Sequence, residues 1–362
     1  MSWEDEENEM SIFENIQYRD DIKYIADFSI PWEKLQGKYI LISGATGLVG
    51  SCLVDTIMYR NYNCGMNCTV YALGRNEKRA QERFEYCWKN EFFQFIPYDI
   101  NCPLICDDIG TVDYVLHLAS NTHPLAYATD PIGTVTTNII GTNNLLDFAV
   151  KHNATRMAFA SSNEIYGENR GDVEKFDEKY CGYIDSNTMR AGYPESKRCG
   201  EALCQAYIKQ KNLDVVIPRL TRSYGPTMLM SDTKAISQFI RKGMAGEDII
   251  LKSEGTQYYS YTYVCDAVSG LLTVLLCGEC GEAYNIADDA SDIMLKDLAA
   301  IIAEYSGTKV VFEMPSEVEA AGYSKATKAR LDGRKLQGLG WSPRYTIKTG
   351  VERTIQILKE KT

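Results

Sequence analysis

The sequence predicts an α/β protein with a doubly wound parallel sheet, followed by a smaller mixed α/β lobe. Three observations carry this prediction. Apolar strand-like runs alternate with helical segments from Lys38 onward, a glycine-rich turn follows the first run, and the pattern breaks into shorter pieces after Pro226. Strict alternation of strands and helices is typical of a parallel sheet with helices on both faces.

The first strand is expected at residues 39–42, where the apolar run stops at Ser43 and Gly44, and helical spacing follows over 48–59. Further strands are expected at residues 69–73, 93–97, 114–118, 157–160 and 215–218. Helices are expected between them, most clearly at 134–151 and 195–211.

The chain after Pro226 is predicted to form a second, smaller lobe. We expect a helix over 234–244, a strand pair around Ile249 and 258–263, and helices over 264–276, 295–305 and 350–359. Residues 1–36 read as an N-terminal extension that packs on the larger domain without supplying chemistry. No internal repeat or long linker separates the two lobes, so they should share one cleft.

Composition restricts the partners. The formal net charge is -11 and the isoelectric point about 5.0, which argues against a nucleic-acid or anionic-membrane partner because both need a concentrated basic surface. No apolar run approaches the ~20 residues that span a bilayer. The acidic start, residues 1–9, lacks the basic and apolar regions of a signal peptide. These features predict a cytoplasmic protein.

The twelve cysteines could indicate disulfides or a metal site. A reducing cytoplasm disfavours disulfides. Cys277 and Cys280 make one CxxC without a matching second pair, and the histidines His117, His123 and His152 are scattered. We therefore expect no metal site and interpret most cysteines as small core residues.

The glycine turn is the first chemical signal. In the segment Gly44-Ala45-Thr46-Gly47-Leu48-Val49-Gly50, glycines stand where a turn must be tight, where the backbone must approach a pyrophosphate, and where helix and strand must pack closely. The turn directly follows an apolar strand and opens a helix, as this mechanism requires. Residues 37–225 are thus predicted to be mainly a Rossmann-type NAD(P)-binding domain, and 226–362 mainly a substrate-binding lobe. A purely structural glycine turn is the alternative.

The residues that would contact the adenosine leave the choice of cofactor open. The second strand is followed by Gly74, Arg75 and Asn76, where an acidic residue usually binds the ribose. Arg75 could accept the 2'-phosphate of NADP, or it could be solvated while NAD is bound. Asp99 and Ile100, just past the third strand, are placed to hold the adenine edge.

The catalytic candidates are Tyr193 and Lys197. They are four residues apart, so on a helix they share one face, and the ammonium could favour the ionised phenol as a base. Tyr207 with Lys211, and Tyr305 with Lys309, have the same spacing. Only Tyr193 follows the Ser161-Ser162 pair at the end of the fifth predicted strand, from which a hydroxyl could face the same cofactor.

These residues together resemble the extended short-chain dehydrogenase/reductases, the NAD-dependent epimerase/dehydratase family. The resemblance runs from about Lys38 to the C-terminus. Beyond the glycine turn and the Tyr-Lys motif, it rests on His117-Leu118-Ala119-Ser120, Asn138 with Gly141-Thr142, the run from Ser161 to Gly167, Arg219 with Tyr224-Gly225-Pro226, Tyr263 to Asp266, and Leu339 to Pro343. It implies bound NAD, with NADP possible, and cofactor contacts from Leu118, Ala119, Ser120, Asn138, Tyr193 and Lys197.

Within the family, the sequence looks most like UDP-glucuronate decarboxylases and next like dTDP-glucose 4,6-dehydratases. The resemblance places Ser162, Tyr193 and Lys197 at the catalytic positions. It also matches Glu164 to a glutamate that these two classes carry near the substrate and that simple 4-epimerases usually lack.

Four positions depart from the decarboxylase pattern. Asn163 replaces a serine or aspartate, Arg222 replaces an asparagine, Tyr259 replaces an arginine that meets substrate phosphate or carboxylate, and Thr227 replaces another arginine. Asn163 cannot donate a proton as an acid, which weighs against a dehydratase. We therefore predict a changed substrate site in which Arg222 supplies the missing charge, with a surface ion pair as the alternative.

The resemblance implies an enzyme that oxidises a nucleotide-linked sugar, at C4, to a keto intermediate and then decarboxylates or dehydrates it. A nucleotide-sugar 4-epimerase and an NADPH-dependent keto-sugar reductase are the alternatives. The helices over 134–151 and 195–211 resemble the pair that forms the dimer interface of the family, so a homodimer is expected.

Overall fold

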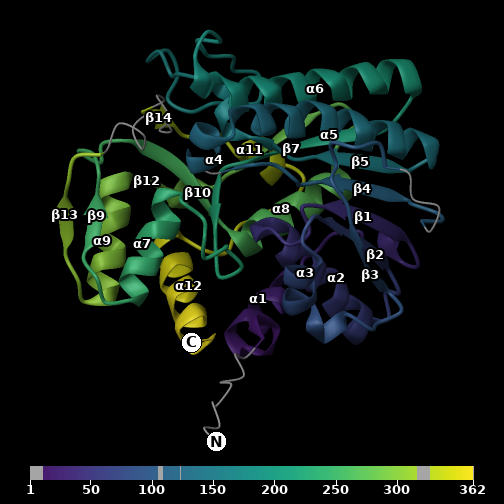
Figure 1. The fold of residues 1–362 in the computed structure, drawn as a ribbon, viewed down its shortest axis with the longest axis horizontal. Coiled ribbons are helices and arrows are strands. Elements are labelled where there is room, and N and C mark those ends of the chain that lie inside the picture. Colours follow the sequence, from purple (N-terminus) through teal and green to yellow (C-terminus); the bar gives the residue numbers. More distant parts are fainter. Residues whose placement is uncertain (1–10, 105–108, 123, 316–326, 362) are drawn as a thin grey trace, which may run out of the picture.

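The computed structural model describes residues 11–104, 109–122, 124–315 and 327–361. The acidic start at residues 1–9 and His123, both used in the sequence analysis, lie outside the described residues. The described chain forms a large sheet with helices on both faces and a smaller lobe beside it (Figure 1).

The large sheet has eight strands, and every pairing in it is parallel. Its order is β11-β7-β5-β4-β1-β2-β3, with β6 paired to β7. The strands are β1 (Tyr39–Ser43), β2 (Thr69–Gly74), β3 (Phe93–Pro97), β4 (Tyr114–His117), β5 (Arg156–Phe159), β6 (Ser161–Ser162), β7 (Val215–Leu220) and β11 (Ala283–Ile286). The strand order reverses between β1 and β4, and ligands of such sheets bind at the carboxyl ends of the strands at this point.

Side-chain alternation along the strands explains the two helical layers. Ile40 and Ile42 of β1 face one hydrophobic core, whereas Leu41 faces the other. The first core includes α2 (Leu48–Cys64) and α8 (Val264–Cys277), and the second includes α5 (Pro131–Lys151) and α6 (Gly192–Lys211). Figure 1 shows α5 and α6 together above the sheet, with α2 and α3 (Glu77–Arg83) below it. This arrangement confirms the predicted doubly wound class.

The smaller lobe packs its helices on short strands (Figure 1). Its helices are α7 (Ala235–Met244), α9 (Leu295–Ser306) and α12 (Ile347–Lys361), and its strands are β8 (Arg222–Tyr224), β9 (Ile249–Leu251), β10 (Tyr258–Tyr263), β12 (Asp292–Met294), β13 (Val310–Phe312) and β14 (Lys328–Ala329). Two short helices lie elsewhere, α4 (Pro124–Thr129) near the cleft and α11 (Arg334–Gln337) against β11.

Two features of this half differ from the sequence pattern. The strands at Ile249 and at residues 258–263 both form, but they are not a pair: β9 pairs with β13, and β10 pairs with β8, β12 and β14. Residues 264–286 lie in the range predicted mainly for the smaller lobe. In the structure, β11 joins the large sheet by pairing with β7, and α8 packs against that sheet. Strand partners are set by contacts distant in sequence, which local periodicity does not encode.

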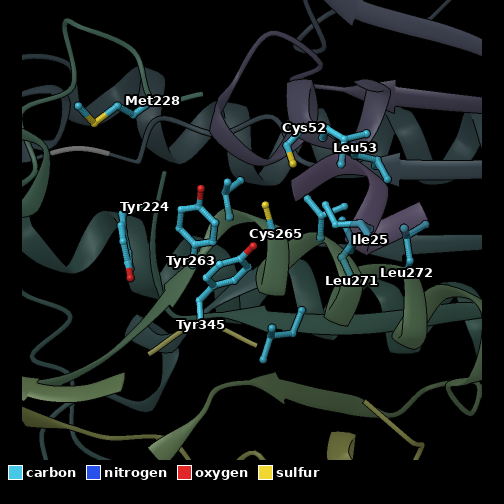
Figure 2. Close-up of a cluster of buried hydrophobic side chains, with 14 of the residues drawn as sticks. Ile25, Cys52, Leu53, Tyr224, Met228, Tyr263, Cys265, Leu271, Leu272 and Tyr345 are labelled. Carbon is cyan, nitrogen blue, oxygen red and sulfur yellow. The ribbon is translucent and has the colours of Figure 1, made fainter. Parts of the chain in front are cut away.

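The N-terminal segment is integrated into the domain. Helix α1 (Ile16–Ala26) packs against α2, α8 and α12. Figure 2 shows its Ile25 beside Leu53 of α2 and Leu271 of α8, in the cluster that also contains Tyr263. Asp21 of α1 is fully buried and accepts hydrogen bonds from the hydroxyls of Tyr263 at 2.7 Å and Tyr345 at 2.5 Å. The segment therefore ties the two lobes together.

Within the described residues, no helix is both long and apolar enough to cross a membrane. Each cysteine in the described part of the chain is free. The same residues contain no group of three or more histidine, cysteine or acidic side chains that could hold a metal ion.

Candidate active site

One large cavity, of about 790 Å³, lies between the two lobes. Side chains from the glycine turn, from the carboxyl ends of the large-sheet strands, and from β8, α7 and β10 line it. This volume falls in the range of small-molecule and cofactor sites. The position at the strand order reversal is the one that a doubly wound sheet uses for a nucleotide ligand.

The glycine turn leaves no room for side chains. Gly44 has φ +71°, and a Cβ there would lie 2.7 Å from the backbone nitrogen of Ala119. A Cβ on Gly50 would lie 2.3 Å from the carbonyl oxygen of Gly44, and one on Gly47 would lie 3.2 Å from the same atom. Gly47 is the N-cap of α2 and supplies no side-chain cap, so the amides of the first helical turn face the cavity that the turn lines. These amides and the helix dipole suit a pyrophosphate, so the turn fits a dinucleotide.

The predicted cofactor residues mostly meet at this cavity. It is lined by Gly44, Thr46, Gly47, Leu48, Val49, Gly50, Arg75, Asp99, Ile100, Leu118, Ala119 and Ser120. The backbone nitrogens of Leu118 and Ala119 donate to the Ser43 hydroxyl at 3.2 and 3.3 Å, which holds this segment against the end of β1. Tyr98 and Arg79, which the sequence analysis did not single out, also line the cavity.

Two predicted cofactor residues do not line the cavity. Asn76 is the N-cap of α3, where its side chain accepts the backbone N–H of Arg79 at 3.0 Å. Asn138 is fully buried; its amide donates to the Ser196 hydroxyl at 2.9 Å and its oxygen accepts from Ser120 at 2.7 Å. Asn138 therefore positions Ser120 and helix α6, which is a supporting role and not a direct contact with the cavity.

At the adenosine side, Arg79 is more firmly placed than Arg75. The Arg79 guanidinium donates to the carbonyl oxygen of Thr46 at 2.9 Å, and burial lowers its pKa. Arg75 lines the cavity but is exposed. Arg79 therefore stabilises the glycine turn, whereas Arg75 lies exposed at the edge of the cavity.

Tyr193 begins α6 and is buried against Ser162 and Tyr127. Its ring stacks on Tyr127 with 4.8 Å between centroids. The pKa of Tyr193 is raised to about 12, mainly by burial and also by the negative charge of Glu164, while the hydrogen bond with Ser162 and the charge of Arg190 act in the opposite direction. The fold therefore gathers Tyr193, Ser162 and Glu164 at one end of the cavity.

Lys197 is buried beside the strand end that carries Ala160. The Lys197 ammonium donates to the carbonyl oxygen of Ala160 at 2.8 Å and lies 4.9 Å from the ring centre of Phe159. Burial lowers the pKa of Lys197 to about 8. In the chain without ligands, burial favours the neutral forms of both Tyr193 and Lys197. That the ammonium favours the ionised phenol stays a prediction.

Arg190 is a functional candidate that the sequence analysis missed. It lies in the 3-10 turn Met189–Ala191 just before α6, and it donates to both carboxylate oxygens of Glu164, at 2.9 and 2.7 Å. Its guanidinium also lies 4.6 Å from the ring centre of Tyr127. Its place three residues before Tyr193, about one helical turn, is the sequence signal that could have identified it.

The predicted substrate residues also line the cavity. Asn163 is buried at the start of the 3-10 turn Asn163–Tyr166. Arg222 of β8 lies over the ring of Tyr259 of β10, with its guanidinium carbon 3.4 Å from the ring centre. Thr227 instead donates to the carbonyl oxygen of Leu48 at 2.7 Å, which joins the second lobe to the helix of the glycine turn.

Comparisons with known proteins agree with this architecture. The family model of the NAD dependent epimerase/dehydratase family matches residues 40–287. UDP-glucuronic acid decarboxylase 1 of Xenopus tropicalis is 31% identical over 325 residues, which cover 90% of this chain and 73% of that protein. UDP-glucuronic acid decarboxylase 3 of Arabidopsis thaliana is 30% identical and is aligned over 86% of each chain.

Solved structures share the fold. A dTDP-glucose 4,6-dehydratase from Streptomyces venezuelae, crystallised with NAD, matches with a TM-score of 0.76 and 24% identity over 89% of this chain and 97% of that one. A UDP-glucuronic acid 4-epimerase from Bacillus cereus, in complex with UDP-glucuronic acid and NAD, matches with a TM-score of 0.74 and 23% identity over 89% and 99%. With its glycine turn, its cavity and these relatives, the chain belongs to the NAD-dependent epimerase/dehydratase family and is an NAD-dependent enzyme.

Proposed function

We propose that this enzyme acts on a nucleotide-diphosphate sugar that bears a carboxylate, by C4 oxidation followed by decarboxylation, as in UDP-glucuronate decarboxylases. One observation carries the proposal: Tyr193, Ser162 and Glu164 line the same cavity as the glycine turn. The support from relatives is the identity of about 30% to proteins named UDP-glucuronic acid decarboxylases over most of the chain.

The glycine turn and the segment Leu118–Ser120 would hold the cofactor, because both line the cavity and an added Cβ at Gly44 or Gly50 would collide with backbone atoms. When bound, the nicotinamide supplies a place for the hydride taken from the sugar and later returned to it. The protein residues then have to bind the sugar, orient it and move protons.

The residues at the catalytic end can divide these tasks. Tyr193 takes the proton from the C4 hydroxyl, and Ser162 hydrogen-bonds the same oxygen. The resulting C4 ketone allows the C5–carboxylate bond to break, with its electrons passing into an enolate as carbon dioxide leaves. Glu164 then carries the proton that C5 needs, and Tyr193 returns its proton to the C4 oxygen.

A nucleotide-sugar 4-epimerase is the second candidate, and one contact favours it. Both carboxylate oxygens of Glu164 accept hydrogen bonds from Arg190, so this carboxylate is already occupied by an ion pair within the protein. Epimerisation at C4 needs no proton carrier at C5. A dehydratase is less favoured, since Asn163 has no acidic proton to donate.

Mass spectrometry of the products tests the proposal. The purified protein is incubated with UDP-glucuronate, UDP-glucose, dTDP-glucose and CDP-glucose, and with a Tyr193→Phe variant as the control. Loss of carbon dioxide from UDP-glucuronate with the wild type alone is the expected result. An unchanged mass with a new isomer by chromatography would establish the epimerase instead, and loss of water would establish a dehydratase.

We also propose a homodimer in the cytoplasm. Helices α5 and α6 lie side by side over the sheet, and Ile132 and Ile140 of α5 expose 78% and 44% of their surface. Two such helices from each subunit can form a four-helix interface that covers these side chains. Sedimentation that finds only monomer at micromolar concentration would overturn the dimer. The free cysteines fit a reducing compartment.

A further inference from the structure

The charge balance at the catalytic end of the cavity is uneven. Arg190 and Arg222 both line this end, but only Arg190 has an acidic partner, Glu164, on which it makes two hydrogen bonds. In the described part of the chain, Arg222 forms no ion pair with an acidic side chain, and its Nη1 nitrogen is shielded from solvent without a hydrogen-bond partner. A shielded guanidinium nitrogen without an acceptor is costly, so a partner is expected for it.

The stacking of Arg222 fixes its direction. Arg222 is paired in register with Tyr261, and Tyr259 lies two residues away on the same face of β10. The guanidinium face covers the Tyr259 ring at 3.4 Å, which leaves the nitrogens at its edge to make hydrogen bonds in the guanidinium plane. A planar fork of this kind matches the two oxygens of a carboxylate or a phosphate.

The surroundings of Tyr259 place this fork near the reacting end. Tyr259 is buried, which raises its pKa; Arg222 lowers that pKa, Glu164 raises it and Arg190 lowers it. Tyr259 therefore lies close enough to Arg222 and to the Glu164–Arg190 pair for the charge of each to change its pKa. Glu164 in turn acts on Tyr193, so Arg222 lies at the sugar end of the cavity.

We propose that Arg222, held flat by Tyr259, is the specificity residue that recognises a carboxylate on the sugar of the substrate. This inference rests on the proposed function, because it takes the substrate to be a nucleotide sugar. It assigns recognition of the sugar carboxylate to β8, the strand of the smaller lobe that follows directly after β7 in the chain.

The test is calorimetric binding of UDP, UDP-glucose and UDP-glucuronate to the full-length protein with its cofactor, with every protein, including the one with wild-type Arg222, carrying Tyr193→Phe so that UDP-glucuronate is not consumed. We expect the wild type to bind UDP-glucuronate about tenfold or more tightly than UDP-glucose, since a charge-assisted fork is lost with the uncharged sugar. In Arg222→Met, this ratio falls to about one, and UDP binds as it does to the wild type. Arg222→Lys keeps the charge but not the fork, so it retains only part of the ratio.

The matched control is Lys242→Met. Lys242 also lines the cavity but is paired with Glu247 at 2.8 Å, so its removal leaves the ratio unchanged. Thermal unfolding of each variant shows whether the fold is intact, and Arg222→Lys serves if Arg222→Met unfolds.

Three results would overturn the inference in distinguishable ways. An unchanged preference for UDP-glucuronate in both Arg222 variants removes Arg222 as the carboxylate residue while the proposed function stands. Equal weakening of UDP, UDP-glucose and UDP-glucuronate assigns Arg222 to the diphosphate instead. A wild type that binds none of the three ligands overturns the proposed function itself, and this inference with it.

Discussion

Arg190 holds Glu164 by both carboxylate oxygens, at 2.9 and 2.7 Å, directly beside the phenol of Tyr193. The pair has two consequences for the proposed chemistry. It occupies both carboxylate oxygens of Glu164, and it holds a negative charge where that charge raises the pKa of Tyr193. The same contact therefore bears on both the base and the proton carrier.

Replacing Glu164 with glutamine separates the two candidate reactions. If Glu164 carries the proton to C5, Glu164→Gln lowers the release of carbon dioxide from UDP-glucuronate by about 100-fold or more. Reduction of the cofactor in a single turnover should persist, because that step uses Tyr193. Stopped-flow absorbance and product analysis measure the two steps separately.

The matched control is Glu195→Gln, since Glu195 is a glutamate of α6 that lies outside the cavity and accepts a hydrogen bond from Ser186 at 2.9 Å. Its turnover should equal that of the wild type. Full carbon dioxide release by Glu164→Gln would remove Glu164 from the chemistry.

Tyr193→Phe should abolish nearly all turnover. The change keeps the ring that stacks on Tyr127 and removes only the hydroxyl, so the loss reports general acid/base catalysis and should reach about 100-fold or more. Tyr207→Phe is the control, because Tyr207 lies on the same helix with the same spacing to a lysine, and its hydroxyl donates to Asp147 at 2.6 Å. Turnover of Tyr193→Phe within a few-fold of the wild type would contradict the assignment.

Titration of Tyr193 offers an independent check. Its pKa of about 12 without ligands means that the tyrosinate should be absent at neutral pH. The ultraviolet difference spectrum between the wild type and Tyr193→Phe should therefore show no tyrosinate until strongly alkaline pH. Glu164→Gln should shift this titration to lower pH, because it removes a charge that raises the pKa. A tyrosinate signal from Tyr193 near neutral pH in the ligand-free wild type would show that Lys197 acts as its spacing suggested.

Gly44→Ala should weaken NAD binding, whereas the same substitution at a glycine outside the cavity should not. The added Cβ would lie 2.7 Å from the Ala119 nitrogen in a backbone with positive φ, so the turn must move away from the pyrophosphate. Losing one charge-assisted hydrogen bond costs about 1.5–3 kcal/mol, which is about tenfold or more in affinity. Gly65→Ala is the control: its φ is +60° and nothing lies within 4 Å of its Cβ, so it should lose about 1 kcal/mol of stability and no NAD affinity. Equal NAD affinity in Gly44→Ala and the wild type would contradict the pyrophosphate site.

Asp266 should make the stability of the fold depend on pH. Burial raises its pKa from 3.8 to about 7, although it accepts the backbone N–H groups of Arg344 and Tyr345 at 2.9 Å. The folded carboxyl thus binds a proton that the unfolded one releases between about pH 4 and pH 7. Its stabilising contribution is full below pH 4 and is lost as the pH rises through 7, by at most on the order of 4 kcal/mol.

Denaturant unfolding of Asp266→Asn across this range measures the effect. The unfolding free energy of the wild type should fall relative to that of the variant as the pH rises. Asp27→Asn, at an exposed side chain on the end of α1, should follow the wild type at every pH. A pH-independent difference for Asp266→Asn would mean that the group stays charged when folded.

Features that short segments encode could be predicted from the amino-acid sequence alone. Alternating periodicity located six of the eight strands of the large sheet and the helices α2, α5 and α6. The glycine spacing identified a turn in which an added Cβ would meet backbone atoms. The motif around Tyr193 and the Ser162 position also follow from local spacing, because one strand end and one helix start carry them.

Contacts between distant segments could not be predicted from local patterns and are seen only in the folded structure. Arg190 meets Glu164 across 26 residues, Arg222 meets Tyr259 across two strands, and β9 finds β13 instead of β10. The hydrogen bond from the Lys197 ammonium to the Ala160 carbonyl is likewise a contact between distant segments, because β5 and α6 together surround this ammonium. Local spacing fixes which face of a helix or strand a side chain is on, whereas its partner and its pKa depend on burial and charge contributed by elements far away in the chain.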